Sequence, residues 1–300
     1  MAGLSSRDLL PAALKSLARM AALLSLAWLA ATGWMWWTQD SLVYHPRTYT
    51  TPPSTPGRLG LAFEDVRLKT ADGETLAAWW VPARDAVHGK TRAVLILHGN
   101  AGNISHRLDY LQPLQRMGYS VLLPDYRGFG ASSGQPNERG TYADADAAWA
   151  WLIARGYTPQ QVVVLGESLG GAVAAELAAR VQPQALILAS TFTSMIELGA
   201  ELYPWLPVRW VSRYRYDTLT GVRAYRGPVL VAHSPADRLV PYTHGERLHA
   251  AVQGPRELLQ LAGDHNDAFL FARPQWTTAV ADFLGRVAAA EEQKIGIHRN

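Results

Sequence analysis

The chain has 300 residues, of which 48% are hydrophobic, so it is long enough for one large α/β domain or two small ones with a full core. The formal net charge is only +3 and the basic residues form no stripe, which argues against binding to nucleic acid. The absence of cysteine excludes disulfides, thiolate metal sites and a cysteine nucleophile, and it suits an oxidising compartment.

An uncharged apolar run covers residues 20–37 and reaches the lower end of the length that spans a membrane. Three basic residues precede the run and one acidic residue follows it: Arg7, Lys15, Arg19 and Asp40. The positive-inside tendency therefore predicts residues 1–19 as a cytoplasmic tail, residues 20–37 as a transmembrane anchor, and the remaining chain on the non-cytoplasmic side, which is the periplasm in a bacterium.

Two alternatives to an anchor stay open for this run. The small residues Ala30-Ala31-Thr32 fit the cleavage site of a signal peptide, and a helix buried against the enzyme domain is the other possibility. Cleavage would leave Trp34, Trp36 and Trp37 near a free terminus, whereas in an anchor they lie where an interfacial aromatic belt is expected. We expect an uncleaved anchor.

Residues 38–60 are predicted as a linker, because four prolines with Thr, Ser and Gly fall in residues 46–60. A catalytic domain is predicted over residues 61–290, with a cap insertion at about 193–227 and a carboxyl-terminal tail over 291–300. The cap is inferred because some three dozen residues, rich in aromatic side chains, separate two successive strands.

The predicted domain begins with two strand-like runs, residues 62–69 and 74–81, and the Asp72-Gly73 pair between them indicates an antiparallel hairpin. Strands and helices then alternate. The further predicted strands are residues 93–97, 120–124, 162–165, 185–189, 229–232 and 257–261, and helices are predicted around 108–117 and over 141–155. This alternation predicts a mostly parallel central sheet with helices on both faces.

The stretch around Ser168 organises the predicted domain. Four branched apolar residues, 162–165, read as a buried strand, and an alanine-rich run after Gly170 reads as a helix. The sequence Gly166-Glu167-Ser168-Leu169-Gly170 between them has the strand–turn–helix context of a nucleophile elbow. Ser168 is therefore the candidate nucleophile, and a surface turn that happens to contain serine is the alternative.

A serine nucleophile needs a base that takes its proton and an acid that orients the base. Asp237 and His265 each follow an apolar strand, and the order Ser, acid, His is the one used on this architecture. We expect Asp237 as the acid and His265 as the base. His233 precedes the acid and is expected to have a role in local packing or hydrogen bonding, and His244 and His249 fall on a predicted surface helix.

The predicted oxyanion hole consists of two backbone N–H groups. One belongs to Leu169, directly after the nucleophile, and the other to Asn100, in the loop after an early strand where Gly99 lets the backbone turn. A plain glycine-containing loop is the alternative at this place. No phosphate-binding or metal-helix motif is present, so we predict neither a metal nor an organic cofactor.

Four motifs together resemble the α/β-hydrolases whose oxyanion sequence is His98-Gly99-Asn100-Ala101-Gly102-Asn103. The other three are the segments 124–130 (PDYRGFG), 166–170 (GESLG) and 265–267 (HND). This group includes membrane-anchored bacterial serine hydrolases and eukaryotic bud-emergence-type and protein-depalmitoylating relatives. The likeness covers roughly residues 60 to 285. It implies Ser168, Asp237 and His265 as the triad and Asn100 and Leu169 as the oxyanion donors. Ser234 and Asp264 depart from the family pattern, where glycine is usual.

The sequence therefore predicts a membrane-anchored serine hydrolase that cleaves carboxylic esters or thioesters through an acyl-enzyme. Lipophilic acyl compounds are its candidate substrates. The partners expected are an acyl ester substrate and, through the amino-terminal helix, a membrane, with no nucleic acid; the oligomeric state is left open. A serine aminopeptidase or amidase with the same site is one alternative, and a catalytically silent membrane-tethered binding protein is another.

Overall fold

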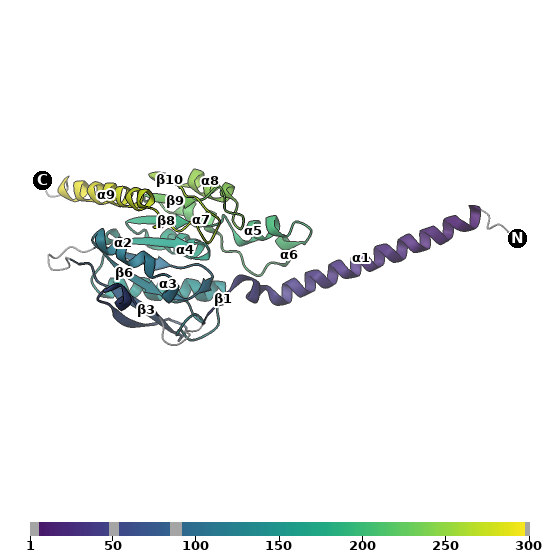
Figure 1. Ribbon diagram of the computed structural model, residues 1–300, viewed down its shortest axis with the longest axis horizontal. Helices are drawn as coiled ribbons and strands as arrows, with labels where there is room; N and C mark the ends of the chain where they lie inside the picture. The colour runs from purple at the N-terminus through teal and green to yellow at the C-terminus, as the bar shows by residue number, and fades with distance from the viewer. Residues whose placement is uncertain (1–5, 48–53, 85–91, 298–300) are drawn as a thin grey trace.

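A computed structural model describes residues 6–47, 54–84 and 92–297. Parts of the predicted amino-terminal tail (1–5), linker (48–53) and carboxyl-terminal tail (298–300) lie outside the described residues. Figure 1 shows a domain with strands between layers of helices, and a single long helix that projects from it.

The domain contains an eight-stranded sheet with the order β10-β9-β8-β7-β4-β6-β3-β2. Its strands are β2 (Glu64–Lys69), β3 (Thr75–Val81), β4 (Arg92–Leu97), β6 (Tyr119–Pro124), β7 (Val162–Glu167), β8 (Ala185–Ala189), β9 (Val229–His233) and β10 (Arg256–Gln260). The six strands from β10 to β6 run parallel, and β3 and β2 continue the sheet antiparallel. The mostly parallel sheet predicted from the sequence is confirmed.

The helices cover both faces of this sheet. Those of the domain are α2 (Leu111–Arg116), α3 (Glu138–Ala154), α4 (Leu169–Val181), α5 (Met195–Leu202), α6 (Val208–Val211), α7 (Thr218–Ala224), α8 (Tyr242–Ala251) and α9 (Pro274–Ile297), with 3₁₀ turns η1 (Pro56–Leu59), η3 (Ile104–His106), η4 (Leu108–Tyr110) and η5 (Pro159–Gln161). Side chains of α3, α4, α7 and α8 share one buried cluster, and those of α2 and α9 share the other.

Alternation along β7 divides the core between the two faces. Val162 and Val164 belong to one buried cluster and Val163 and Leu165 to the other, and all four are fully buried. A strand that is covered on both faces needs apolar residues at every position, which is why the run of branched residues forms a central strand. Because parallel strands point the same way, the loops that follow them gather at one edge of the sheet.

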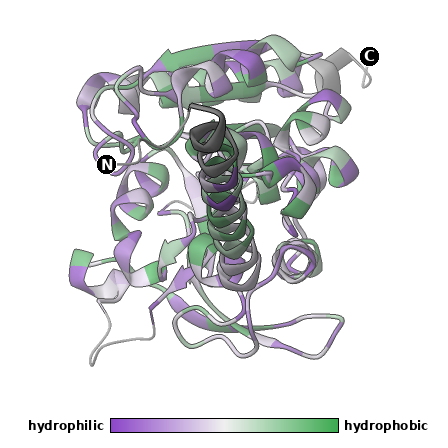
Figure 2. Cartoon of the chain, turned by 90° about the vertical axis from the view of Figure 1, so that its right-hand side faces the viewer, coloured by the Kyte–Doolittle hydropathy of each residue, from purple (hydrophilic) through white to green (hydrophobic). Residues whose placement is uncertain are grey.

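The helix α1 (Ser6–Val43) is the long projecting helix, and Figure 2 shows the side of the molecule from which it leaves. Among the described residues it is the one helix long and apolar enough to cross a membrane, over Leu14–Val43, although a signal sequence passes the same test. Leu23, Leu26 and Leu29 expose 71%, 69% and 60% of their surface. This apolar surface has no protein cover.

The helix α1 extends beyond the predicted span 20–37 at both ends and includes the first six residues of the predicted linker. No proline interrupts residues 38–43, since the first linker proline is Pro46, so nothing in the local sequence ends the helix earlier. The chain then forms β1 (His45–Pro46), which pairs with β5 (Ala101–Gly102) in a small separate sheet. At the other terminus, α9 continues to Ile297, through most of the predicted tail.

The segment predicted as the cap, about 193–227, contains α5, α6 and α7. Its last helix packs tightly on the domain, because a Cβ at Gly221 would come within 2.7 Å of the Ala175 backbone in α4. The projecting part is therefore α5, α6 and the turn between them, residues 195–211, and the name cap is used below for these residues.

Candidate functional site

Ser168 lies in the tight turn between β7 and α4. Its backbone has φ +52° and ψ −119°, a conformation that residues other than glycine rarely adopt. The turn is held by a hydrogen bond from the Ser168 N–H to the Ala189 carbonyl (2.9 Å) and by one from the Thr191 hydroxyl to the Ser168 carbonyl (2.6 Å). Strain of this kind at a strand-to-helix turn presents the serine hydroxyl at the edge of the sheet.

Two glycines make the turn possible. A Cβ at Gly166 would lie 2.3 Å from the Gly170 carbonyl oxygen, and a Cβ at Gly170 would lie 2.0 Å from the Leu97 carbonyl oxygen. Both contacts involve backbone, which cannot rotate away. The sequence therefore needs glycine at these two positions so that α4 can start against the ends of β7 and β4.

The structure brings the three predicted catalytic residues into one hydrogen-bonded row. The Ser168 Oγ and His265 Nε2 atoms are 3.1 Å apart, and His265 Nδ1 is 2.7 Å from Asp237 Oδ2. Ser168 follows β7, Asp237 follows β9 and His265 follows β10, so the row forms from loops at one edge of the sheet. This geometry is the one in which a base activates a serine hydroxyl while an acid orients the base.

The Asp237 carboxylate is buried but well supplied with partners. Its Oδ1 accepts hydrogen bonds from the backbone N–H groups of Leu239 (3.0 Å) and Val240 (2.8 Å). Burial alone would raise its pKa, but His233, His265 and the Val240 amide together hold the pKa of Asp237 below its usual range. Asp237 is therefore a carboxylate that can orient His265 and stabilise a positive charge on its ring.

Leu169 and Gly99, the residue before Asn100, both lie beside Ser168. Leu169 is the first residue of α4, where N–H groups have no partner within the helix. Asn100 follows Gly99, and a Cβ at Gly99 would make ordinary contact with the Ser168 Cβ at 3.5 Å. The loop after β4 thus passes directly against the serine.

The loop that contains Asn100 is held by the end of α1, a contact that the sequence analysis missed. The Asn100 side-chain amide donates to the Val43 carbonyl (2.7 Å), and the Asn100 carbonyl accepts from the His45 N–H (2.9 Å). The Asn103 side chain donates to the Arg47 carbonyl (2.9 Å). The segment directly after the candidate membrane span is therefore part of the architecture of the site.

The two departures from the family pattern connect the acid loop to the base loop. The Ser234 hydroxyl donates to the Gly263 carbonyl (2.6 Å). The Asp264 carboxylate accepts from the backbone and the guanidinium of Arg238 and from the His265 backbone N–H. Asp264 therefore positions the backbone of the base loop, and its pKa, lowered to about 2 by these hydrogen bonds, keeps it charged.

Two further polar groups near the site were missed or misjudged. Glu167, the residue directly before the nucleophile in the elbow sequence, accepts a hydrogen bond from the Tyr110 hydroxyl (2.5 Å) and lies 3.4 Å from Arg107 Nε. His244 was expected on a surface helix, and this is wrong, because it is fully buried and its ring bonds to the Thr193 hydroxyl (2.7 Å). His244 faces the domain because α8 packs against β9.

Within residues 6–47, 54–84 and 92–297, no group of three or more histidine and acidic side chains is arranged to hold a metal ion. The chemistry available at this edge of the sheet is that of a hydroxyl, an imidazole, a carboxylate and nearby backbone N–H groups. These groups suit acyl transfer through a serine.

Comparisons with known proteins agree with this architecture. A family model described as alpha/beta hydrolase fold matches residues 92–224. An uncharacterized protein of Mycobacterium tuberculosis is 39% identical, with the match covering 85% of this chain and 90% of that one; the alpha/beta hydrolase domain-containing protein WAV2 of Arabidopsis thaliana is 32% identical with the same coverage. The solved structure of a Pyrococcus furiosus esterase superposes with a TM-score of 0.65 at 21% identity, over 81% of this chain and 98% of the esterase.

Proposed function

The chain belongs to the α/β-hydrolase family, and we propose that it is a serine hydrolase that cleaves carboxylic esters or thioesters through an acyl-enzyme. The observation that carries this proposal is the row of hydrogen bonds from Ser168 through His265 to Asp237. Within the family, the sequence of residues 98–103 favours the group that the four motifs resemble.

In the proposed reaction, His265 Nε2 takes the proton of the Ser168 hydroxyl as the oxygen attacks the acyl carbon. The positive charge that forms on the ring is stabilised by Asp237, which stays ionised because of its lowered pKa. His265 then gives the proton to the leaving alcohol or thiol, and the acyl group stays on Ser168. A water molecule, deprotonated by the same ring, releases the acid and restores the serine.

The negative oxygen of each tetrahedral intermediate is assigned to the backbone N–H groups of Asn100 and Leu169. Preorganised donors of this kind usually provide the largest electrostatic contribution to catalysis. The closeness of Gly99 to Ser168 and the position of Leu169 at the start of α4 support this assignment. The proposed mechanism needs neither a metal nor an organic cofactor.

We also propose that α1 anchors the protein in a membrane and that the catalytic domain lies on the non-cytoplasmic side, the periplasm if the source is bacterial. The exposed leucines of α1 support the anchor, because in water they would form an uncovered apolar surface. The basic residues Lys15 and Arg19 before the span support the orientation.

Hydrolysis of p-nitrophenyl butyrate by the full chain in detergent micelles tests the proposed chemistry. Replacement of Ser168 by alanine should lower kcat by a factor on the order of 10⁶, the loss measured for a triad serine in a well-studied serine protease. Ser41→Ala is a matched control, because its hydroxyl bonds only within α1 (2.9 Å to the Thr38 carbonyl). Equal rates for wild type and Ser168→Ala would refute the serine mechanism, and hydrolysis of aminoacyl amides in preference to esters would identify a peptidase instead.

A further inference from the structure

The cap lies along the half of α1 that is nearest to the domain. The Trp28 indole N–H donates to the Trp205 carbonyl (2.7 Å), and Gln39 bonds to the backbone of Val211 (2.9 Å) and Arg213 (2.7 Å). Between these contacts, Met35 is buried in a small cluster with Leu206 and Val208. From Trp28 to Gln39 the helix rises about 16 Å, so the contact is a long side-by-side one.

This arrangement fixes how deep the cap sits if α1 crosses a membrane. The predicted span ends at Trp37, and Trp28 lies nine residues earlier, about 14 Å along the helix axis. The hydrocarbon core of a bilayer is about 30 Å thick. A cap that reaches Trp28 therefore enters the leaflet on the side of the catalytic domain.

The surface of the cap suits that location. Trp210 exposes 89% and Trp205 exposes 59% of its surface, and Leu202 and Tyr203 are also exposed. Tryptophan and tyrosine are enriched where a membrane meets water. Three charged residues lie in the cap. Arg209 has a long side chain that can place its charge at the headgroups, and Glu197 and Glu201 face α8, where they lie 2.8 Å from Arg247 and 3.2 Å from His244.

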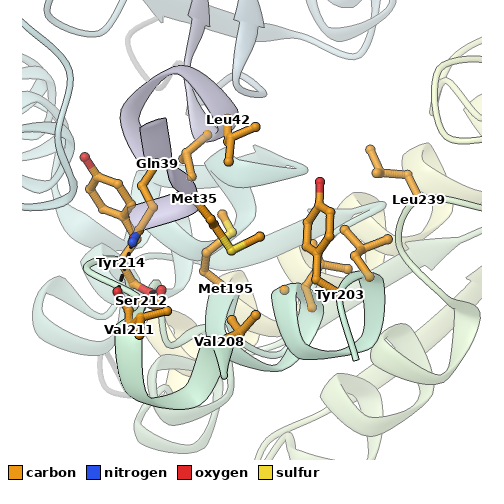
Figure 3. A pocket seen from close by; sticks show the side chains of 14 residues that line it. Met35, Gln39, Leu42, Met195, Tyr203, Val208, Val211, Ser212, Tyr214 and Leu239 are labelled. Carbon is orange, nitrogen blue, oxygen red and sulfur yellow. Dashed lines mark hydrogen bonds between the residues drawn. The ribbon is translucent and has the colours of Figure 1, made fainter. Parts of the chain in front are cut away.

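Between α1 and the cap lies an apolar cavity of about 190 Å³. Figure 3 shows side chains from α1, such as Met35 and Leu42, and side chains from the cap, such as Tyr203, around this cavity. It exceeds the roughly 150 Å³ of an engineered apolar cavity that stays dry and binds benzene. Most of the residues that line it are apolar, so the cavity suits a hydrocarbon chain.

The cavity also borders the candidate active site. Leu239, which lines it, is two residues beyond Asp237 and also lines a depression on the surface beside His265. Val43, on another side, accepts the hydrogen bond from Asn100 in the predicted oxyanion loop. Hydrocarbon in this cavity would thus lie between the leaflet and the catalytic row.

We propose that the cap is seated in the membrane leaflet and that the cavity between α1 and the cap binds the acyl chain of a lipid ester drawn directly from that leaflet. This inference rests on the proposed serine hydrolase function for its chemistry, because the ester must reach Ser168. It assigns the anchor helix a second role as one wall of the substrate site.

Membrane depth is measured first, on the full chain reconstituted in phosphatidylcholine vesicles. The natural chain has no cysteine, so Trp210→Cys can be labelled with a single fluorophore without other changes. Lipids brominated on their acyl chains should quench this label strongly. They should leave a label at Leu258→Cys unquenched. Leu258 is also exposed, but it lies on β10, the end strand of the central sheet, and not in α1 or the cap. Equal quenching at both positions would overturn the membrane seating.

Acyl-chain binding is measured next in a form that needs no catalysis. A phosphatidylcholine with a photoactivatable group in the middle of one acyl chain should crosslink to residues of the cavity, in wild type and in Ser168→Ala. Leu202→Trp should reduce this crosslinking about tenfold by filling the cavity, whereas Leu258→Trp makes the same substitution elsewhere on the surface. Crosslinking that Leu202→Trp leaves unchanged would overturn the proposed chain site.

Turnover separates this proposal from the proposed function. The ratio of kcat/KM for p-nitrophenyl palmitate to that for p-nitrophenyl butyrate should fall about tenfold in Leu202→Trp and stay unchanged in Leu258→Trp. An unchanged ratio in Leu202→Trp contradicts the acyl-chain site while leaving the hydrolase intact. If the protein crosslinks to the lipid but hydrolyses no ester, the proposed hydrolase function is contradicted, while the proposed acyl-chain site stands. A peptide that carries the same photoactivatable acyl chain is offered as a competing probe. Crosslinking of this lipidated peptide in place of phosphatidylcholine would contradict a lipid ester as the substrate.

Discussion

Replacement of Gly170 by alanine tests how closely α4 must approach the sheet. The added Cβ would lie 2.0 Å from the Leu97 carbonyl oxygen and 2.5 Å from the His98 carbonyl oxygen. Both are backbone atoms at the end of β4, so the helix or the strand end has to move. Overpacking in a filled core costs about 1–3 kcal/mol, and we expect about 3 kcal/mol here because no side chain can yield.

In a domain of this size, each kcal/mol lowers Tm by about 2–4 °C, so Gly170→Ala should lower Tm by about 6–12 °C in differential scanning calorimetry. Ester hydrolysis should also fall, because the displaced strand end continues into the loop of Asn100. Gly285→Ala is the matched control. Gly285 is exposed in α9 with open space around it, so alanine there should stabilise by about 0.5–1 kcal/mol. A Tm for Gly170→Ala within about 2 °C of wild type would refute the close-contact reasoning.

Three further predictions concern polar groups. Asp237→Asn should lower kcat by a factor on the order of 10⁴. The pKa of Asp237 is lower in the folded state than in the unfolded chain, so the ionised side chain stabilises the fold above about pH 4, and this contribution is lost as the pH falls toward the folded pKa. The difference in unfolding free energy between wild type and Asp237→Asn, measured with urea, should therefore become smaller from pH 7 to pH 3. A difference that becomes larger would contradict this reasoning. Arg127→Met should cost about 3–5 kcal/mol of stability by removing the guanidinium from the buried Asp144 carboxylate, which keeps the hydrogen bond from the backbone N–H of residue 127 (2.8 Å), and Asp144→Leu in the same chain should recover part of the loss; no recovery would contradict the pairing. Asn100→Ala should lower kcat/KM about fivefold and Tm by about 2–4 °C through loss of the hydrogen bond to the Val43 carbonyl, and a 100-fold loss of kcat/KM would show that the side chain itself acts in catalysis.

The elbow could be predicted in detail because its signals are local. The run 162–165 is apolar at every position, as a strand covered on both faces requires, and the glycines at 166 and 170 mark the close approach of helix and strand. The two other members of the row, Asp237 and His265, were predicted from their position after apolar strands. Their meeting follows from the parallel sheet, which sets the ends of these strands at one edge.

The support for the oxyanion loop could not be predicted in the same way. His45 and Pro46 look like the start of a proline-containing linker, and nothing local indicates that they pair with Ala101 and Gly102, more than fifty residues away. The position of His244 was misjudged for a similar reason. The helix around it has polar residues, and only its packing against β9 determines which face is buried.

The departures from the family pattern gained a meaning only from the structure. Asp264 stands next to His265 in the sequence, where a carboxylate can either act on the imidazole or face water. In the structure its carboxylate bonds instead to Arg238 and to the His265 backbone. The direction of a side chain in a loop depends on partners from other loops, and a single sequence does not specify them.

The most direct test of the account is labelling of the full chain with a fluorophosphonate, followed by mass spectrometry of the modified peptide. We predict one adduct, located on Ser168, which is absent in Ser168→Ala and forms far more slowly in His265→Ala than in His249→Ala. An adduct on another residue, or labelling that Ser168→Ala leaves unchanged, would contradict the central claim that the row of Ser168, His265 and Asp237 activates this serine as a nucleophile.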